Sequence, residues 1–215
     1  DCPGQASVSN LDIKNKSGKG HIVKAKKIDL SGIITITEKD IKYKVIAALD
    51  KTKGFSDGEI NFKNGFKINY ETDNLDFEEI KEVADLKFKG LAKIKGSTSG
   101  NSDSATFSLQ AESENFEFED YYFGKMETSL NYKAGHLFFK NLKGLIESTR
   151  YKGTLDIDLT KDMIFGNIQL PFFRMEDVQQ AVVKKVDLGG RFLGSGSGKV
   201  SLNTPFDVDK LSFNI

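Results

Sequence analysis

Strict alternation of apolar and polar residues is the feature of this chain that most constrains its fold. Over residues 107–112, Phe, Leu and Ala occupy every second position and Ser, Gln and Glu stand between them, and the pattern recurs over 130–133 and 155–159. Successive side chains of a β-strand point to opposite faces, so a period of two predicts strands with one apolar and one charged face. The chain is therefore expected to be mainly β, with antiparallel strands.

Turn signals divide this pattern into neighbouring strands. Asn64-Gly65 stands between two alternating runs, and an Asn-Gly pair in that position is a strong signal for a tight hairpin. Further turns are expected at 133–135, 141–144 and 160–162, and a loop rich in Gly, Ser and Asn is expected over 96–104. Few long connections remain, so consecutive strands are expected to be neighbours in the sheet.

Two segments interrupt the strand pattern, and they resemble each other. In residues 75–100 and 172–198, an acidic stretch with helical apolar spacing leads to an Asp-Leu pair and then to a Gly- and Ser-rich strand. Glu78 and Glu176 are 98 residues apart, and so are Gly100 and Gly198. A fixed offset predicts a repeated unit. We expect short helices near 76–85 and 174–186, and two units, 1–100 and 101–215, in one continuous sheet.

Charge and cysteine content argue against several classes of partner. The 31 basic and 31 acidic residues of the 215-residue chain cancel, so no net field favours nucleic acid or an anionic membrane surface. Cys2 is the single cysteine and cannot form an internal disulfide. Asp1 precedes it without an apolar signal sequence, which favours a free thiol over a lipid anchor. No apolar run approaches the 18 residues of a membrane-spanning helix.

Neither a catalytic nor a metal-binding constellation emerges. The run from Gly194 to Lys199 resembles a phosphate-binding loop, but Leu193 and Val200 occupy the positions where a P-loop requires glycine and Ser or Thr. His21 and His136 lie at no metal-ligand spacing from each other or from Cys2. The acidic residues of 112–120 alternate with phenylalanines, as in a solvated strand face. We expect no enzyme activity, no metal and no cofactor.

The apolar side of the sheet is then the candidate site. In a closed sandwich or small barrel it would be ordinary core, whereas in an incurved open sheet it would line a groove. At about 25 cal/mol per Å², burying it is worth tens of kcal/mol, so either the protein or a bound acyl chain is expected to cover it. The expected lining comprises Phe62, Phe66, Ile68, Phe107, Leu109, Phe116, Phe118, Leu130, Tyr132, Phe139, Leu155, Ile157, Leu159, Ile168 and Leu170.

The second half of the sequence resembles a repeat unit of the TamB and AsmA-like proteins of Gram-negative envelopes. The likeness covers residues 123–215 and rests on a meander containing YKGTLDIDL, a short helix after the strand at Ile168, and the glycines of GRFLGSGSGKV before a Pro-containing turn. It implies a strongly curved antiparallel sheet built of repeating β-grooves, either an open β-taco or a partly closed barrel. The high Lys and Phe content departs from the family.

The resemblance implies a non-enzymatic fragment of a periplasm-spanning protein, with the parent protein anchored in the inner membrane outside this fragment. Its groove would carry phospholipid acyl chains between the inner and outer membranes, with a BamA-type outer-membrane protein as a partner. The alternative is a scaffold or assembly factor that pairs with outer-membrane or secretion-system proteins through strand edges. A type II secretion N-protein, which is similar to the AsmA group, stays open, and a surface adhesin-like domain would instead require a closed sandwich.

Overall fold

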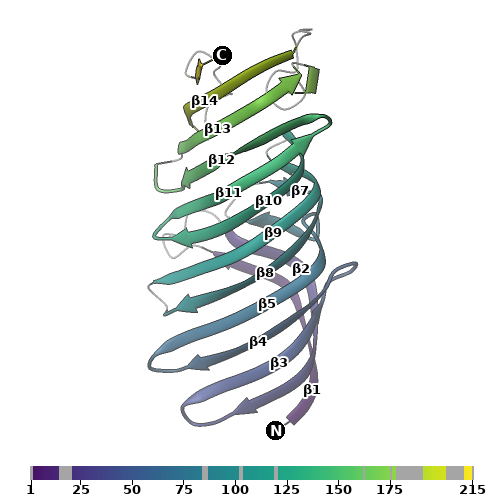
Figure 1. Cartoon of the computed structure of the whole chain (residues 1–215). Coiled ribbons are helices and arrows are strands. Elements are labelled where there is room, and N and C mark those ends of the chain that lie inside the picture. Colours follow the sequence, from purple (N-terminus) through teal and green to yellow (C-terminus); the bar gives the residue numbers. More distant parts are fainter. Residues whose placement is uncertain are drawn as a thin grey trace.

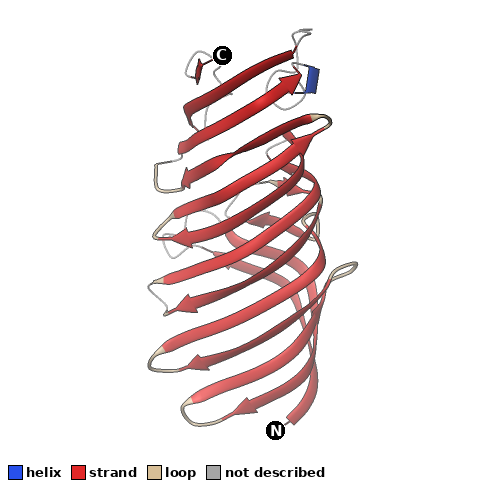
Figure 2. Ribbon diagram, viewed as in Figure 1, coloured by secondary structure: helices blue, strands red, loops and turns tan. Residues whose placement is uncertain are grey.

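One antiparallel β-sheet makes up almost the whole described structure (Figure 2). The computed structural model describes residues 2–14, 21–83, 87–101, 104–118, 121–161, 163–174, 176–177, 191–201 and 211–214. The expectation of a mainly β, antiparallel fold is confirmed. The strands are β1 (Cys2–Lys14), β2 (His21–Ile36), β3 (Asp40–Ala48), β4 (Lys53–Asn61), β5 (Gly65–Asp76), β6 (Ile80–Val83), β7 (Phe88–Lys89), β8 (Leu91–Gly100), β9 (Ala105–Phe118), β10 (Tyr121–Lys133), β11 (His136–Ile146), β12 (Thr149–Asp158), β13 (Met163–Arg174), β14 (Arg191–Ser201) and β15 (Leu211–Asn214).

The sheet is open rather than closed into a barrel. Its order is β1-β2-β3-β4-β5-β8-β9-β10-β11-β12-β13-β14-β15, with β6 paired to β2 and β7 paired to β9. In the described residues no pairing joins β1 to β15. Figure 1 shows the strands curving strongly, with β1 and β2 passing behind β8 and β9. Strands that follow each other in the chain are neighbours in the sheet, except where β6 and β7 lie between β5 and β8, as the short connections predict.

The first predicted helix, near 76–85, is wrong. Residues 77–79 form a turn, and β6 pairs antiparallel with residues 23–25 of β2; residues 84–86 lie outside the described part. β2 has 16 residues and β3 has 9, so one end of β2 extends past β3 with open backbone hydrogen-bonding groups. Pairing with β6 gives these backbone groups hydrogen-bond partners. The segment therefore forms a strand although Phe77 and Ile80 stand at helical spacing.

The second predicted helix, near 174–186, is not confirmed. β13 continues to Arg174, and Glu176 and Asp177 form a helical turn. Residues 178–186 lie outside the described part of the chain.

The loop predicted over 96–104 is wrong in its first half, because β8 continues to Gly100. A Cβ on Gly96 would lie 2.5 Å from the Cβ of Leu109 in β9. Glycine here lets two strands lie close together rather than marking a loop.

Three of the four predicted turns are found. The hairpins reverse at 62–64, 134–135 and 159–161, and Ala134 and Gly135 have φ of 50° and 82°, as a two-residue hairpin turn requires. The turn predicted at 141–144 is wrong. Asn141 adopts a φ of 54° inside β11 and produces a bulge between Phe139 and Leu142, and the chain reverses only at 147–148.

Strand bounds recur at the 98-residue offset seen in the sequence. β5 and β13 both have 12 residues, and both their first and their last residues differ by 98. The offset therefore holds for this pair of strands, whereas β8 and β14 begin 100 residues apart. The division into units 1–100 and 101–215 stays a prediction.

Candidate functional site: the apolar face of the sheet

Rows of side chains cross the sheet on one side, which we call the apolar face. Residues that are register partners on neighbouring strands share a face, so each row can be followed from strand to strand. Ten strands from β2 to β13, separated by nine gaps of about 4.8 Å, give a face about 43 Å long. One row comprises Ile34, Tyr43, Gly58, Ile68, Thr98, Phe107, Tyr132, Leu137, Ile157 and Ile164, and the next comprises Gly32, Val45, Ser56, Tyr70, Gly96, Leu109, Leu130, Phe139, Leu155 and Gly166.

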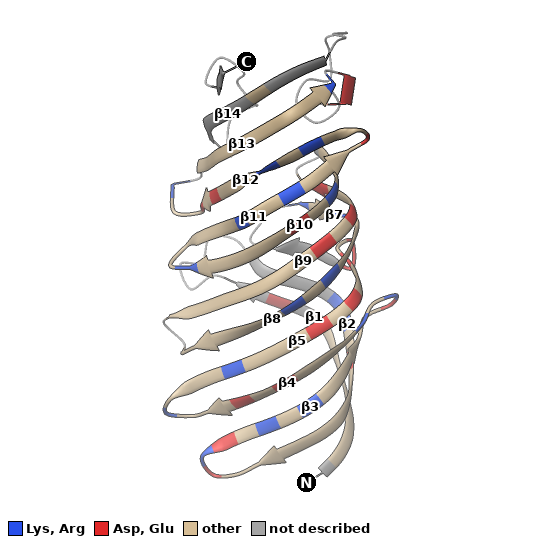
Figure 3. Cartoon of the chain, viewed as in Figure 1, with Lys and Arg blue, Asp and Glu red and all other residues tan. Residues whose placement is uncertain are grey.

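The opposite face is mostly polar. The row between the two above, followed over the same strands, reads Ile33, Lys44, Asp57, Asn69, Ser97, Ser108, Asn131, Phe138, Asp156 and Phe165. Neighbouring strands are linked there by ion pairs such as Lys95–Glu71 at 2.9 Å and Lys125–Glu114 at 2.7 Å. Figure 3 shows charges of both signs distributed over the strands. Water therefore solvates this side, and the apolar face must be covered in another way.

The apolar face is buried most deeply over β10–β12 and less deeply over β2–β5, which we call its open half. Over β10–β12 the chain covers it with its own side chains: Ile157 is 0% exposed and Leu137 is 3% exposed. Over β2–β5, Ile34, Tyr43 and Ile68 are half-buried, while Val45 of β3 is 6% exposed. The buried cluster comprises Phe116, Phe118, Met126, Leu137, Phe139, Leu142, Ile146, Tyr151 and Ile157.

The residues predicted to line a groove, except Phe62, lie on the apolar face or pack against its buried cluster. Phe66, Ile68 and Leu109 are half-buried on this face. A second group packs against the cluster: Phe107, Leu130, Tyr132, Leu155, Leu159, Ile168 and Leu170. Phe116, Phe118, Phe139 and Ile157 are part of the cluster itself, so they are closed core in this structure. A lipid-lining role for the set stays a prediction.

Phe62 lies away from the other predicted residues. It follows β4 in the turn to β5, its side chain is 59% exposed, and its backbone N–H donates to Lys39 O at 3.0 Å. The alternation of Ile60 and Phe62 with polar residues continues one residue beyond the strand, and the sequence pattern does not reveal where the strand ends.

Phenylalanines join the segment between β5 and β8 to the end of β9. The ring of Phe88 lies 5.3 Å from Phe118 and 5.9 Å from Phe116, and Phe77 lies 6.1 Å from Phe116 (centroid distances). Phe123 extends the group at 6.0 Å from Phe116. Tilted and edge contacts at these distances are favourable beyond the area they bury. The cluster closes the apolar face at this end of β9.

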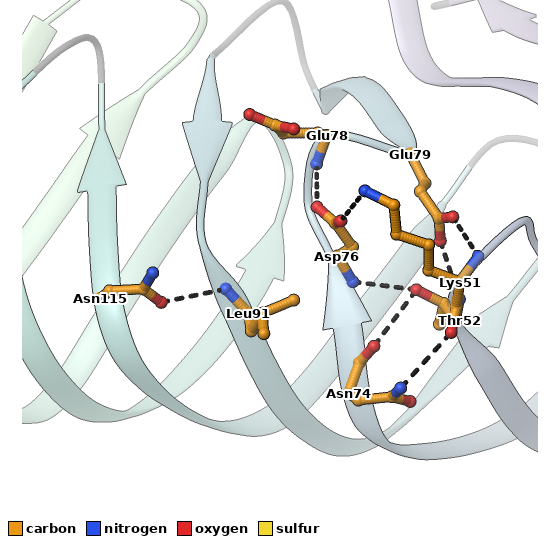
Figure 4. A network of polar contacts seen from close by, with 8 residues as sticks. All are labelled: Lys51, Thr52, Asn74, Asp76, Glu78, Glu79, Leu91 and Asn115. Carbon is orange, nitrogen blue, oxygen red and sulfur yellow. Dashed lines mark hydrogen bonds and ion pairs between the residues drawn. The ribbon is translucent and has the colours of Figure 1, made fainter.

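A polar clamp holds the β3–β4 loop against the end of β5 (Figure 4). The buried Thr52 hydroxyl donates to Asn74 O at 3.2 Å and accepts from Asp76 N at 2.9 Å. The Glu79 carboxylate accepts from the backbone N–H groups of Lys51 and Thr52, the latter at 3.0 Å. The loop's backbone donors are thereby satisfied where the chain leaves β5 for β6.

A second clamp recurs 98 residues later. The buried Asp177 carboxylate accepts from Ser148 N at 3.1 Å, Ser148 Oγ at 2.7 Å and Thr149 Oγ1 at 2.9 Å. Arg174 N donates to Thr149 Oγ1 at 2.9 Å, as Asp76 N does to Thr52. Burial opposes ionisation of Asp177, but the hydrogen bonds from Ser148 and Thr149 outweigh it and hold the pKa of this carboxyl below its usual value.

The sequence reasoning missed both clamps. The sequence contained a signal, because the two clamps use residues at corresponding positions. Glu79 of the first corresponds to Asp177 of the second, and Asp76 corresponds to Arg174, at the same 98-residue offset as the glycines. Their hydrogen-bond partners include Thr52 and Thr149, which are 97 residues apart in the sequence. Neither threonine lies in a run of alternating apolar and polar residues. Only the placement of the loops shows that these residues meet.

His136 and the nearby aspartates make contacts within the β11–β12 hairpin and the turn after β12. His136 Nδ1 lies 3.2 Å from Asp156 Oδ1, and its ring stacks on Phe138 at 5.5 Å. Asp158 Oδ1 accepts from Thr160 Oγ1 at 2.6 Å and caps the following turn. The hydrogen bond from the Thr160 hydroxyl lowers the pKa of Asp158, burial raises it, and Lys161 lowers it again. The net result is a pKa far below the usual value. In the described residues no group of three His, Cys, Asp or Glu side chains is placed to hold a metal ion.

The glycine run that resembles a phosphate loop is strand. Gly194 and Gly196 to Gly198 lie within β14 and pair with β13. Extended backbone does not form the concave cradle of N–H groups that binds phosphate. Among the described residues no helix is long and apolar enough to cross a membrane.

Comparison with known proteins adds no assignment: no family model, curated protein or solved structure matches the chain.

Proposed function

We propose that this protein binds acyl chains on the open half of its apolar face, as a non-enzymatic lipid carrier. The observation that carries the proposal is the half-burial of Ile34, Tyr43 and Ile68 over β2–β5 on an apolar face whose other half is packed shut. These three side chains stay partly exposed, and each Å² of apolar surface left in water costs about 25 cal/mol. An acyl chain lying along the row would remove these apolar side chains from water, and a hydrocarbon chain needs no hydrogen-bond partner there.

The dimensions of the apolar face suit a hydrocarbon ligand. A bilayer core of two acyl leaflets is about 30 Å thick, and the face is about 43 Å long. The strong curvature of the strands in Figure 1 would turn the face into a groove, the β-taco arrangement expected of TamB and AsmA-like proteins. In that setting the chain would carry phospholipid through the periplasm between two membranes, with a BamA-type protein as partner.

A matched pair of substitutions tests the proposal. Ile68→Asp places a charge on the open half of the apolar face, whereas Ile46→Asp places it on the polar face, where Ile46 is 52% exposed. Purified protein is incubated with phospholipid vesicles and the bound lipid is extracted and measured by mass spectrometry. Ile68→Asp should retain several-fold less phospholipid than the unchanged protein and Ile46→Asp should retain as much. A folded protein that takes up no phospholipid contradicts the proposal, as does equal loss in both variants.

Strand pairing with another protein is the second candidate function, favoured by the open sheet. β1 and β15 each have one sheet neighbour in the described structure, and free edges accept an added strand. Photo-crosslinks from a client that map to β1 or β15 would favour this function, and crosslinks that map to Ile34, Tyr43 and Ile68 would favour the lipid carrier.

A further inference from the structure

The open half of the apolar face contains a band of hydroxyl groups. Four strands that are neighbours in the sheet each contribute one hydroxyl side chain to this face, and all four side chains are half-buried. They are Tyr43 of β3, Ser56 of β4, Tyr70 of β5 and Thr98 of β8. Tyr43 and Thr98 stand in the row of Ile34 and Ile68, and the other two stand in the next row. We call these four residues the hydroxyl band.

A row of hydrocarbon side chains lies beside the hydroxyl band on the same face, and we call it the hydrocarbon row. It stands two residues along each strand from the row of Tyr43, and a separation of two residues keeps side chains on one face. It crosses β2 to β5 through the register partners Ile36, Ile41, Ile60 and Phe66. Ile36 is 71% exposed, and the other three are half-buried. The open half therefore presents hydrocarbon and hydroxyl groups side by side.

The two tyrosine hydroxyls of the band make only long contacts within the protein. Tyr43 Oη lies 3.4 Å from Ser56 Oγ, and Ser56 Oγ donates its own hydrogen to Asn69 O at 2.9 Å. Tyr43 is therefore the donor in the longer contact. Thr98 Oγ1 donates to Tyr70 Oη at 3.3 Å. Hydrogen bonds between two oxygens ordinarily measure about 2.5–3.0 Å, so both tyrosine contacts are weak.

Each of these tyrosines can donate its hydrogen to a bound ligand, and the surroundings favour a neutral acceptor. The Tyr70 hydroxyl accepts from Thr98, and its own hydrogen has no acceptor among the residues that the structure describes. Burial raises the pKa of Tyr70, and the hydrogen bond from Thr98 offsets this only in part, so the hydroxyl keeps its proton. The two rows that contain the band carry no charged side chain from β2 to β8. A charged acceptor would therefore leave water without meeting an opposite charge.

We propose that the hydroxyl band binds the ester carbonyls of a glycerolipid whose acyl chains lie on the hydrocarbon row. This inference rests on the lipid binding proposed above, and it names the chemical class of the lipid. An ester carbonyl is a neutral acceptor attached directly to an acyl chain, so a single ligand can contact the hydrocarbon row and the hydroxyl band together. Tyr43 and Tyr70 stand two strands apart, and a lipid can use either hydroxyl according to its position along the row.

Competition between an ester lipid and an ether lipid tests this inference. The probe is a vesicle that contains equal amounts of dioleoyl phosphatidylcholine and of dioleyl ether phosphatidylcholine, which has the same headgroup and chain length but no carbonyl. The purified chain is incubated with these vesicles, and the bound lipids are extracted and measured by mass spectrometry. The ester lipid should be taken up about threefold to tenfold more, as the gain or loss of one hydrogen bond predicts. Equal uptake of both lipids overturns this inference and leaves the lipid carrier standing, whereas uptake of neither lipid overturns both.

A double variant that combines Tyr43→Phe and Tyr70→Phe tests whether these hydroxyls are responsible. Phenylalanine keeps the ring and removes only the hydroxyl, so the double variant should take up the ether lipid as the unchanged protein does. Its preference for the ester lipid should be lost. The control is Tyr122→Phe, because Tyr122 packs against the buried cluster outside the open half, and this variant should keep the preference. Uptake of the ether lipid shows that the double variant is folded, and a preference that survives in it overturns the inference.

Discussion

Replacing Thr52 by valine tests whether the clamp at the end of β5 stabilises the fold. Thr52 is 3% exposed, and its hydroxyl makes two hydrogen bonds, to Asn74 O and from Asp76 N. Valine has nearly the same shape, so packing is kept while both backbone groups lose their partner. Each buried unsatisfied group costs about 1–3 kcal/mol, so we expect a loss of about 2–4 kcal/mol. For a chain of this size that corresponds to a thermal midpoint lower by roughly 5–15 °C.

The equivalent change Thr149→Val should act in the same direction. Thr149 is fully buried, donates to the Asp177 carboxylate and accepts from Arg174 N. Hydrogen bonds to a charged acceptor are stronger than neutral ones, so the loss should equal or exceed that of Thr52→Val. The two clamps share no hydrogen-bond partner, so the double variant should lose the sum of both within about 0.5 kcal/mol.

Urea unfolding followed by far-UV circular dichroism measures these losses, since the chain has no tryptophan. Thr106→Val is the control, because its hydroxyl donates at 3.3 Å to Ser99 O near the exposed β8–β9 turn. It should change stability by less than about 0.5 kcal/mol. If Thr52→Val unfolds at the same urea concentration as Thr106→Val, the clamp does not stabilise the fold.

Two further predictions concern a cross-strand contact and the response to acid. Gly144→Ala should destabilise the fold by about 1–3 kcal/mol, because a Cβ there would lie 2.1 Å from the buried Tyr151 ring. That ring is held in place because its hydroxyl donates to Phe123 O. The control is Gly4→Ala, where a Cβ would meet nothing within 4 Å and the thermal midpoint should stay unchanged. Asp158 has a folded-state pKa below its unfolded value, so its contribution is present above pH of about 4 and is lost as the pH falls further. The urea midpoint should therefore drop below pH 4, and Asp158→Asn should make that drop shallower; an unchanged acid dependence would contradict this assignment.

The alternation of residues was sufficient to predict the strands and their apolar side. Phe107, Leu130, Leu155 and Ile168 lie where a period of two places them, because a sheet with one wet face leaves little freedom in register. The hairpins at Asn64-Gly65 and Ala134-Gly135 could also be predicted, because the residues of a tight turn determine its backbone conformation locally.

Long-range pairing explains what the sequence did not reveal. The helical spacing around Ile80 is real, but an open stretch of β2, some 55 residues earlier in the chain, offers backbone partners that a short helix cannot match. The glycines of β8 indicate a loop by composition, yet Gly96 is required by the approach of Leu109 from the next strand. The clamps join residues 22 to 29 positions apart. Each error lies where a neighbouring strand sets the outcome.

The difference between the two halves of the apolar face has a cause in the residues of its rows. Where the two rows cross β4 they carry Gly58 and Ser56, and where the second row crosses β8 it carries Gly96. Where the second row crosses β10 to β12 it carries Leu130, Phe139 and Leu155. The small residues do not leave empty pits, because a Cβ on Gly58 would meet the Tyr43 ring at about 3 Å. The Tyr43 ring lies beside the neighbouring Gly58 and takes up the space that a larger side chain would fill. Over β10 to β12, Phe139 is part of the buried cluster, and Leu130 and Leu155 pack against that cluster. The position of the candidate ligand surface therefore follows from side-chain size along a row rather than from hydrophobicity along a strand.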